Sequence, residues 1–176
     1  MATTTLAKGI TSGYLPMGGV IAAPWIAEPF WSGGAGLWRH GYTYSGHPVT
    51  CAVALAAIDV IEQEQLVQAA EVNGKRFLAD LRAALGQHVH VGDVRGLGLM
   101  AAVELVEDKA SKTSFAASRK IGPAVIAEAR RRGLVTRGRG DTIYLGPALV
   151  MQEPMLKRVV EIIAESVHSV LAPGAQ

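Results

Sequence analysis

The chain has 176 residues, of which 49% are apolar and 18% are charged, so it is long enough and apolar enough for one globular domain with a buried core. Its formal net charge of +2 is too small to argue for binding to nucleic acid or to an acidic membrane surface. The single cysteine, Cys51, excludes an internal disulfide framework. No segment reaches the roughly 20 uncharged apolar residues of a membrane span, and no secretory signal is apparent. We therefore expect a cytoplasmic protein.

Glycine and proline are frequent in residues 1–47, which predicts turns rather than long regular elements. Residues 20–23, with the sequence Val-Ile-Ala-Ala, are expected to form a short buried strand, and nothing between Glu28 and Ser45 can support a long helix. Loops held on a scaffold are where chemistry tends to occur. This part of the chain is therefore the first place to look for a functional site.

Two long helices are expected next. Pro48 can occupy the first turn of a helix whose apolar residues recur every three or four positions over 49–61. A second helix over about 66–85 places one apolar face along its length, and Gly86 fits the position just after its C-terminus. That face consists of Ala70, Phe77, Leu78, Leu81 and Leu85.

From His88 onward, shorter apolar runs alternate with helical patterns, which is typical of an α/β or α+β layer arrangement. Alternating apolar residues predict strands over 89–94 and 99–105, joined through Arg95-Gly96-Leu97-Gly98. The remaining expected elements are a helix over about 118–132 that stops at Gly133, a strand pair over 134–136 and 142–145, and an amphipathic helix over about 153–171.

Lys8 is the strongest candidate for chemistry. It lies between small residues in the segment 5–19 and is followed by several glycines, so its amine can approach a flat cofactor without steric obstruction. A neutral lysine amine can attack a carbonyl group to form a Schiff base. Without these neighbours, a lysine near a terminus is more often a solvated surface charge.

A second candidate is Thr43, in the segment 40–52, which lies 35 positions after Lys8. A threonine hydroxyl and exposed backbone N–H groups in a glycine-bounded turn can hydrogen-bond a phosphate. The alternative is that Thr43 and Ser45 only satisfy backbone groups before the helix at Pro48.

A third candidate is Arg137, in the segment 133–149, because a guanidinium fork suits bidentate recognition of a carboxylate. Arg139 is a nearby competitor that a hairpin would expose to solvent. Other charged or metal-ligating types give weaker signals. The arginines at 130–132 suit a helix C-terminus better than nucleic acid, and the histidines at 40 and 47 lack partners at metal-ligand spacing, so no metal site is expected.

The three segments that hold these candidates, 5–19, 40–52 and 133–149, and a fourth segment over 91–105 resemble the class III (omega-type) aminotransferases. They occur in the same order as in that family, and the resemblance covers about residues 5–171. The resemblance implies the α/β architecture of fold type I enzymes that use pyridoxal phosphate (PLP). Residues 1–63 would be the C-terminal part of the large PLP-binding domain, 64–87 a connecting helix, and 88–176 the small C-terminal α/β domain.

The resemblance also implies roles for the three candidates. Lys8 would hold PLP and move the proton of the substrate Cα during transamination between an amine or amino acid and a keto acid. Thr43 would reach the cofactor phosphate of a neighbouring subunit, so a homodimer is expected, and Arg137 would bind the substrate carboxylate. The chain departs from the family at Gly146-Pro147-Ala148, where Ala-Pro-Pro is usual.

In the family, an N-terminal half supplies an acidic partner for the pyridine nitrogen, an aromatic residue stacked on the ring, and a glycine-rich turn for the phosphate. No residue of this chain is a candidate for these roles, so we expect an N-terminally truncated fragment with weak or no activity alone. Two alternatives stay open. One is another fold type I PLP enzyme, such as an aminomutase or racemase, and the other is a non-catalytic dimerising fragment.

Overall fold

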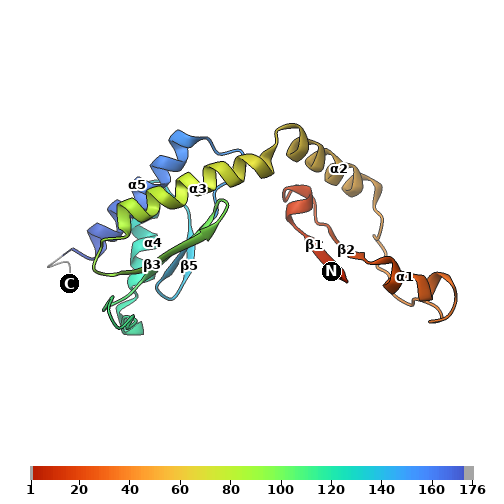
Figure 1. Ribbon diagram of the computed structural model, residues 1–176, viewed down its shortest axis with the longest axis horizontal. Coiled ribbons are helices and arrows are strands. Elements are labelled where there is room, and N and C mark those ends of the chain that lie inside the picture. Colours follow the sequence, from red (N-terminus) through yellow and green to blue (C-terminus); the bar gives the residue numbers. More distant parts are fainter. Residues whose placement is uncertain (1, 173–176) are drawn as a thin grey trace. The chain divides into compact units, whose positions relative to one another are not determined.

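A computed structural model describes residues 2–172, which divide into one compact unit that ends at Gln65 and a second that begins at Leu66 (Figure 1). The elements of the first unit are β1 (Thr3–Ala7), the 3-10 helix η1 (Gly9–Thr11), β2 (Gly18–Ala22), α1 (Pro24–Trp31) and α2 (Pro48–Gln63). Within the described residues, no helix combines the length and hydrophobicity that crossing a membrane requires.

The first unit is built on an antiparallel hairpin in which Ala7 of β1 pairs with Gly18 of β2. The predicted strand over 20–23 is present as β2, but the expectation that it is buried is wrong, because most of its residues are exposed. Strand β1 was not predicted. Between the two strands, the loop over residues 8–17 contains η1, which packs against α2.

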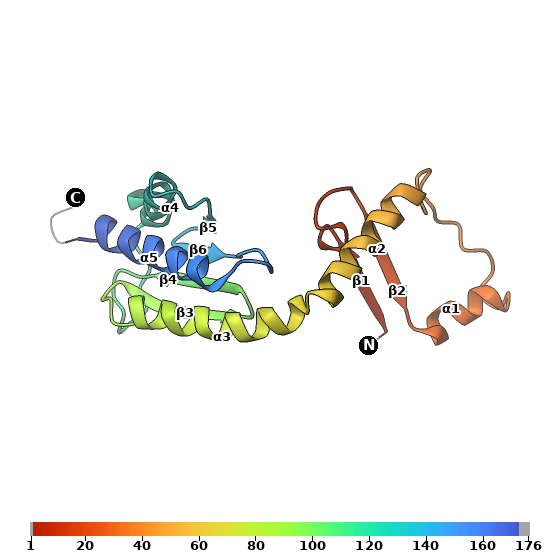
Figure 2. The same ribbon diagram turned by 90° about the horizontal axis from the view of Figure 1, so that it is seen from above.

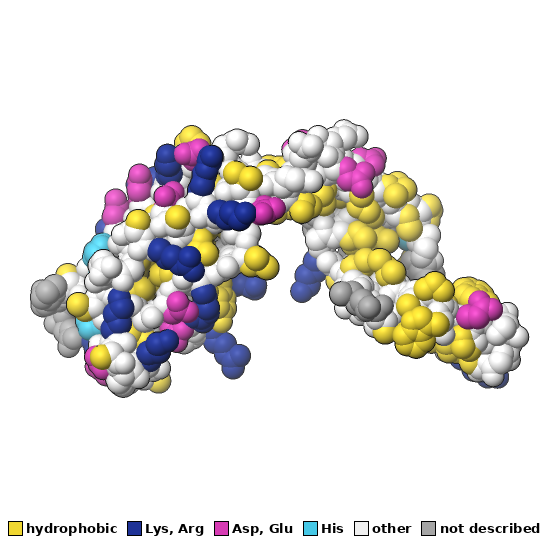
Figure 3. Space-filling view, in the orientation of Figure 1, with side chains coloured by type: hydrophobic (Ala, Val, Ile, Leu, Met, Phe, Trp, Pro, Cys, Tyr) yellow, Lys and Arg dark blue, Asp and Glu magenta, His cyan; other side chains and the backbone are white. Residues whose placement is uncertain are grey.

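Helix α2 extends from Pro48 to Gln63, so Pro48 occupies its first turn, as predicted. The first unit nevertheless has almost no core of its own. Thr11 and Ala54 are the only described residues of this unit that are buried. Figure 3 shows hydrophobic side chains spread over the visible face of this unit. Its large exposed apolar residues include Trp25, Trp31, Trp38, Leu37, Leu55 and Tyr42.

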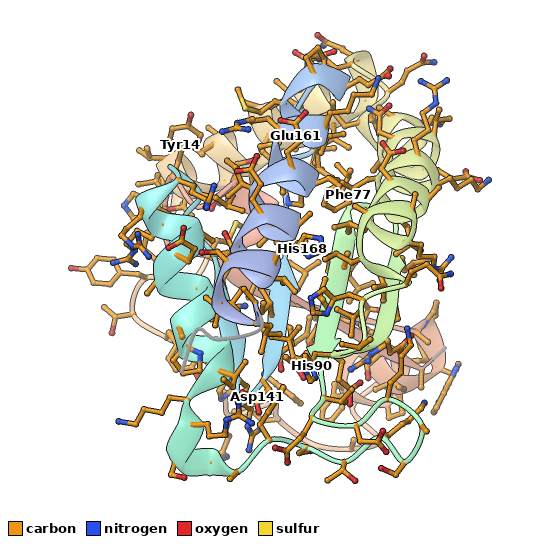
Figure 4. All side chains as sticks on the ribbon, turned by 90° about the vertical axis from the view of Figure 1, so that its left-hand side faces the viewer. Tyr14, Phe77, His90, Asp141, Glu161 and His168 are labelled. Carbon is orange, nitrogen blue, oxygen red and sulfur yellow. The ribbon has the colours of Figure 1, made fainter. Side chains whose placement is uncertain are left out.

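The second unit is a four-stranded antiparallel sheet with the strand order β3-β4-β6-β5, covered on one face by helices (Figure 2). Helices α4, α5 and α3 lie side by side over this face (Figure 4). Its elements are α3 (Leu66–Leu85), β3 (Val91–Leu97), β4 (Met100–Leu105), the 3-10 helix η2 (Ala117–Arg119), α4 (Ile121–Arg131), β5 (Arg137–Arg139), β6 (Thr142–Leu145) and α5 (Glu153–Val170).

The core of the second unit lies between these helices and the sheet. Phe77 of α3 is 1% exposed and points toward α5 (Figure 4), while Val103 and Ile143 from the central strands are fully buried beneath the helices. The apolar face predicted for residues 66–85 is therefore the face that α3 buries. Helix α3, which the sequence placed between two domains, packs on β3 and α5 within the second unit.

Three predictions for the second unit need correction. The segment over 95–98, which was expected to join two strands, is mostly strand itself, because β3 pairs with β4 as far as Leu97. The strand expected over 134–136 is found at 137–139, because a two-residue turn at Gly140 and Asp141, with Gly140 at φ 56°, places Arg139 opposite Thr142. The helix expected from 118 begins at Ile121. The Asp141 carboxylate accepts a hydrogen bond of 2.8 Å from the Gly122 N–H and so fixes this helix start.

Candidate functional site

Lys8 is the first residue of the loop that joins β1 to β2, and its N–H donates to the Met17 carbonyl at 3.3 Å. Its backbone has φ 55° and ψ −75°, a sparsely populated conformation for a residue with a side chain. The Lys8 side chain is exposed and lines a hollow of about 650 Å³, which we call the Lys8 hollow, together with Gly13 and residues 15–18.

The Lys8 hollow is largely apolar. Leu15, Pro16 and Met17 line it with apolar surface, and Gly13 adds no side chain. The same residues 15–18 also line a second hollow of about 560 Å³, whose other residues come from 42–51. The two segments that the sequence singled out in the first half of the chain therefore lie against one another.

Thr43 lies in the turn before α2 and is exposed. The turn is closed by Ser45, whose N–H donates to the Tyr42 carbonyl at 2.9 Å and whose hydroxyl accepts from the Tyr42 N–H at 3.1 Å. Within the part of the chain that the structure describes, the Thr43 hydroxyl makes no hydrogen bond. The purely structural alternative thus describes Ser45, and it leaves the Thr43 hydroxyl available to a ligand.

Arg137 lies at the edge of the sheet face that the helices leave uncovered. The strand register aligns Arg95 with Ala102, Ala102 with Tyr144, and Tyr144 with Arg137, so these four side chains form one row across the sheet. Because Ala102 is small, the row has a hollow of about 690 Å³, here called the sheet hollow, which Leu97 and other residues also line.

Two arginines line the sheet hollow, but only one is free to bind an anion. Arg95 donates to Glu104 at 2.5 Å and to Asp93 at 2.9 Å, and these hydrogen bonds raise the pKa of Arg95 above its ordinary value. Among the described residues, Arg137 forms no ion pair with a carboxylate. Its competitor Arg139 does not line the sheet hollow.

Sequence reasoning missed Tyr144, which is 40% exposed beside Arg137 and has its carbonyl held by the Thr136 hydroxyl at 2.5 Å. The only signal for it was its place in a predicted strand, which does not reveal the cross-strand neighbour. Of the three predicted site residues, Lys8 and Thr43 belong to the first unit and Arg137 belongs to the second.

Comparison with known proteins agrees with these segments. The family model for class III aminotransferases matches residues 3–167. An adenosylmethionine-8-amino-7-oxononanoate aminotransferase from Nitratidesulfovibrio vulgaris is 39% identical over 97% of this chain and 32% of its own length. A putrescine–pyruvate aminotransferase from Pseudomonas aeruginosa is 36% identical over 89% of this chain and 34% of its own length.

Solved structures show the same relationship. An (S)-enantioselective omega-transaminase from Thermomicrobium roseum is 43% identical and superposes with a TM-score of 0.91 over 96% of this chain and 37% of its own. A PMP-bound aminotransferase from Vibrio fluvialis has a TM-score of 0.92 over 97% of this chain and 38% of its own, with 31% identity.

This chain spans about a third of the length of the curated relatives it matches. The predicted α/β architecture of fold type I PLP-dependent transferases is confirmed by the superpositions, which cover nearly all of the chain. With a family model that extends over residues 3–167 as well, the chain belongs to the class III aminotransferases, a family of PLP-dependent enzymes.

Proposed function

We propose that this chain forms the C-terminal part of a transaminase that moves an amino group from an amine or amino acid to a keto acid. The observation that carries the proposal is Lys8, whose exposed side chain starts a glycine-containing loop and lines an open, largely apolar hollow. Because the relatives are about three times as long, the complete activity is proposed for a protein that includes the rest of the family's residues.

Each candidate residue has a role in this proposal. PLP, when bound, withdraws electrons from the substrate Cα so that its proton can leave. The Lys8 amine would hold the cofactor and, when free, would act as the general base for that proton from its position beside the hollow. The unpaired Thr43 hydroxyl would donate to the cofactor phosphate of a neighbouring subunit, so the working form would be a homodimer.

Arg137 would orient the substrate. Its guanidinium has no carboxylate partner in the described residues and lies next to Tyr144, in a sheet hollow that apolar residues also line, so it offers a charge for a carboxylate beside apolar surface. That combination fits a keto acid acceptor or an amino acid donor. The absence of any disulfide-forming pair of cysteines is consistent with the cytoplasm as the place of this reaction.

A labelling experiment tests the proposal on the chain itself. The protein is mixed with PLP and reduced with borohydride, and the modified lysine is identified by peptide mapping. We expect the label on Lys8, and we expect Lys8→Ala to abolish it. Lys112 is a matched control, because it is also exposed with a positive φ of 55° but does not line the Lys8 hollow. Lys112→Ala should leave the label unchanged.

Absence of label on Lys8, or equal label on Lys112, would sink the assignment of Lys8. If Lys8 is labelled, formation of alanine from pyruvate in the presence of an amine donor tests for transamination. Because the complete activity is proposed for the longer protein, this step is decisive there: failure in the longer protein with a labelled Lys8 would favour the non-catalytic alternative. Replacement of Arg137 by Lys should then weaken binding of a keto acid to the chain, whereas Arg139→Lys should not.

A further inference from the structure

Thr11 is the polar residue of the first unit that the fold buries most deeply. Its exposed fraction is 0%, in a unit where Ala54 is the only other described residue that is buried. It lies at the end of η1, three residues after Lys8. A buried threonine requires partners for its polar atoms, and these partners connect it to Lys8.

Thr11 uses its backbone and its side chain to join the two arms of the loop. Its N–H donates to the Lys8 carbonyl at 3.2 Å, and its own carbonyl accepts the Tyr14 N–H at 3.0 Å. Its hydroxyl donates to the Leu15 carbonyl at 2.5 Å and lies 3.3 Å from the Lys8 carbonyl. One residue thus connects the start of the loop to the side that lines the Lys8 hollow.

The backbone of Lys8 needs such support. A φ of 55° with a ψ of −75° lies outside the helical and extended regions, and it persists only where the surroundings hold it. The Lys8 carbonyl also accepts the Gly13 N–H at 3.2 Å, so the backbone N–H groups of Thr11 and Gly13 converge on it. The Thr11 hydroxyl ties the Leu15 carbonyl to this same loop and so keeps both N–H groups on the Lys8 carbonyl. If the loop opened, the peptide would relax toward a negative φ, which would turn the Lys8 side chain elsewhere.

We propose that Thr11 is a positioning residue for Lys8: its hydroxyl bridges Leu15 to η1 and thereby keeps Lys8 in the conformation that presents its amine to the Lys8 hollow. What Lys8 does there rests on the proposed function. The role of Thr11 in holding the Lys8 backbone is independent of the proposed function.

The hydroxyl is the part of Thr11 that can be removed cleanly. Thr11→Val keeps the shape and deletes the donor, which leaves the Leu15 carbonyl without its hydrogen bond. Thr11→Ser keeps the donor and is the conservative rescue. Thr5→Val is a matched control, since Thr5 belongs to β1 of the same hairpin but is exposed.

The first measurement needs no cofactor. At positive φ the amide proton and Hα of one residue lie unusually close, so the intraresidue nuclear Overhauser effect of Lys8 is strong in the full chain. We expect it to stay strong in Thr11→Ser and Thr5→Val and to fall to the ordinary level in Thr11→Val, with the amide signals of α2 unchanged. A weak signal in the unmutated chain, or a strong one in Thr11→Val, would overturn the inference.

The second measurement is the initial rate at which PLP and borohydride label Lys8. Loss of the positioning should lower this rate roughly tenfold in Thr11→Val, because a backbone conformation of this kind is disfavoured by about that factor when unsupported. Thr11→Ser should label within about twofold of the unmutated chain. An unchanged rate in Thr11→Val contradicts the inference. If the unmutated chain is not labelled at all, the proposed function fails, and the spectroscopic result alone decides the role of Thr11.

Discussion

His88 lies in a cluster of cationic and titratable groups at the start of the sheet. Its ring centroid is 5.0 Å from that of His168 at the end of α5 and 5.9 Å from that of His90, and Lys109 Nζ donates to the His88 carbonyl at 3.4 Å. Burial, followed by the charges of His168, His90 and Lys109, lowers the pKa of His88. Its Nδ1 accepts the His90 N–H at 3.1 Å, which requires that nitrogen to be unprotonated.

We predict from this that acid destabilises the second unit through His88. The pKa of His88 is lower in the folded chain than its ordinary value of 6.5, so the unfolded chain binds the proton more readily. The stability that neutral His88 contributes is present above about pH 6.5 and is lost as the pH falls through the folded pKa. Urea midpoints measured near pH 8 and pH 5.5 should therefore differ less in His88→Asn than in the unmutated chain.

His47→Asn, a change in the first unit, serves as the control and should keep the full pH dependence. If the urea midpoint falls equally between pH 8 and pH 5.5 in both variants, His88 does not control the response to acid.

For single residues, the sequence predicted a functional role where the residue belongs to a recognisable motif. Lys8, Thr43 and Arg137 could be named because each stands in a segment with a chemical rationale. Thr11 and Tyr144 could not be identified in this way. The role of Thr11 depends on burial of a hydroxyl inside a loop, and that of Tyr144 depends on which residue faces it across the sheet. Neither is a property of local sequence.

At the scale of elements, α3 depends on a glycine that a helix would ordinarily disfavour. Gly74 is buried where α3 crosses the β3–β4 turn, and a Cβ atom added there would overlap the backbone of Gly98. Gly98 in turn has φ 56°, which fixes the shape of that turn. The close approach of helix and turn is possible because neither residue has a side chain.

We predict that Gly74→Ala destabilises the second unit although it favours the helix. The substitution gains about 1 kcal/mol of helix propensity, but the overlap is with backbone atoms that cannot rotate away, and overpacking of this kind costs about 1–3 kcal/mol or more. The net effect should be a loss, seen as a lower urea midpoint with an unchanged slope. Gly146→Ala is the control, because a Cβ atom there meets no heavy atom within 4 Å, and it should change the midpoint little.

The helices were predicted better than the strands for a physical reason. The apolar residues of α2, α3 and α5 repeat over many turns, so each helix could be located within one or two residues of its ends. A short strand contains too few residues for its alternating pattern to repeat, so its ends are harder to predict. Residues 134–136 have strand-forming side chains, yet the tight turn after Arg139 selects 137–139 as β5. The Thr-rich β1 was missed because it lacks an apolar alternation.

At the scale of the whole molecule, the two units differ in how they are stabilised. The second buries a continuous core between its sheet and three helices. The first leaves large side chains such as Trp31, at 82% exposed, and Tyr44, at 80%, in contact with solvent. Sequence composition predicted a single ordinary core for the chain, because it counts apolar residues without showing which of them a single chain can bury. Exposed apolar patches of this size are typical of surfaces that contact a protein, a membrane or a ligand.

This difference predicts uneven protection from hydrogen exchange in the single chain. Amides of β4, β6 and α5 should exchange only through unfolding of the second unit, since their side chains form its core. Amides of β1, β2 and α1 should exchange orders of magnitude faster through local opening, because few buried contacts hold them. If the proposed homodimer forms from this chain, raising the protein concentration should slow exchange selectively in the first unit, as its exposed apolar side chains become covered. Uniform protection across both units at low concentration would contradict the division of stability, and protection that is independent of concentration would contradict the proposed dimer.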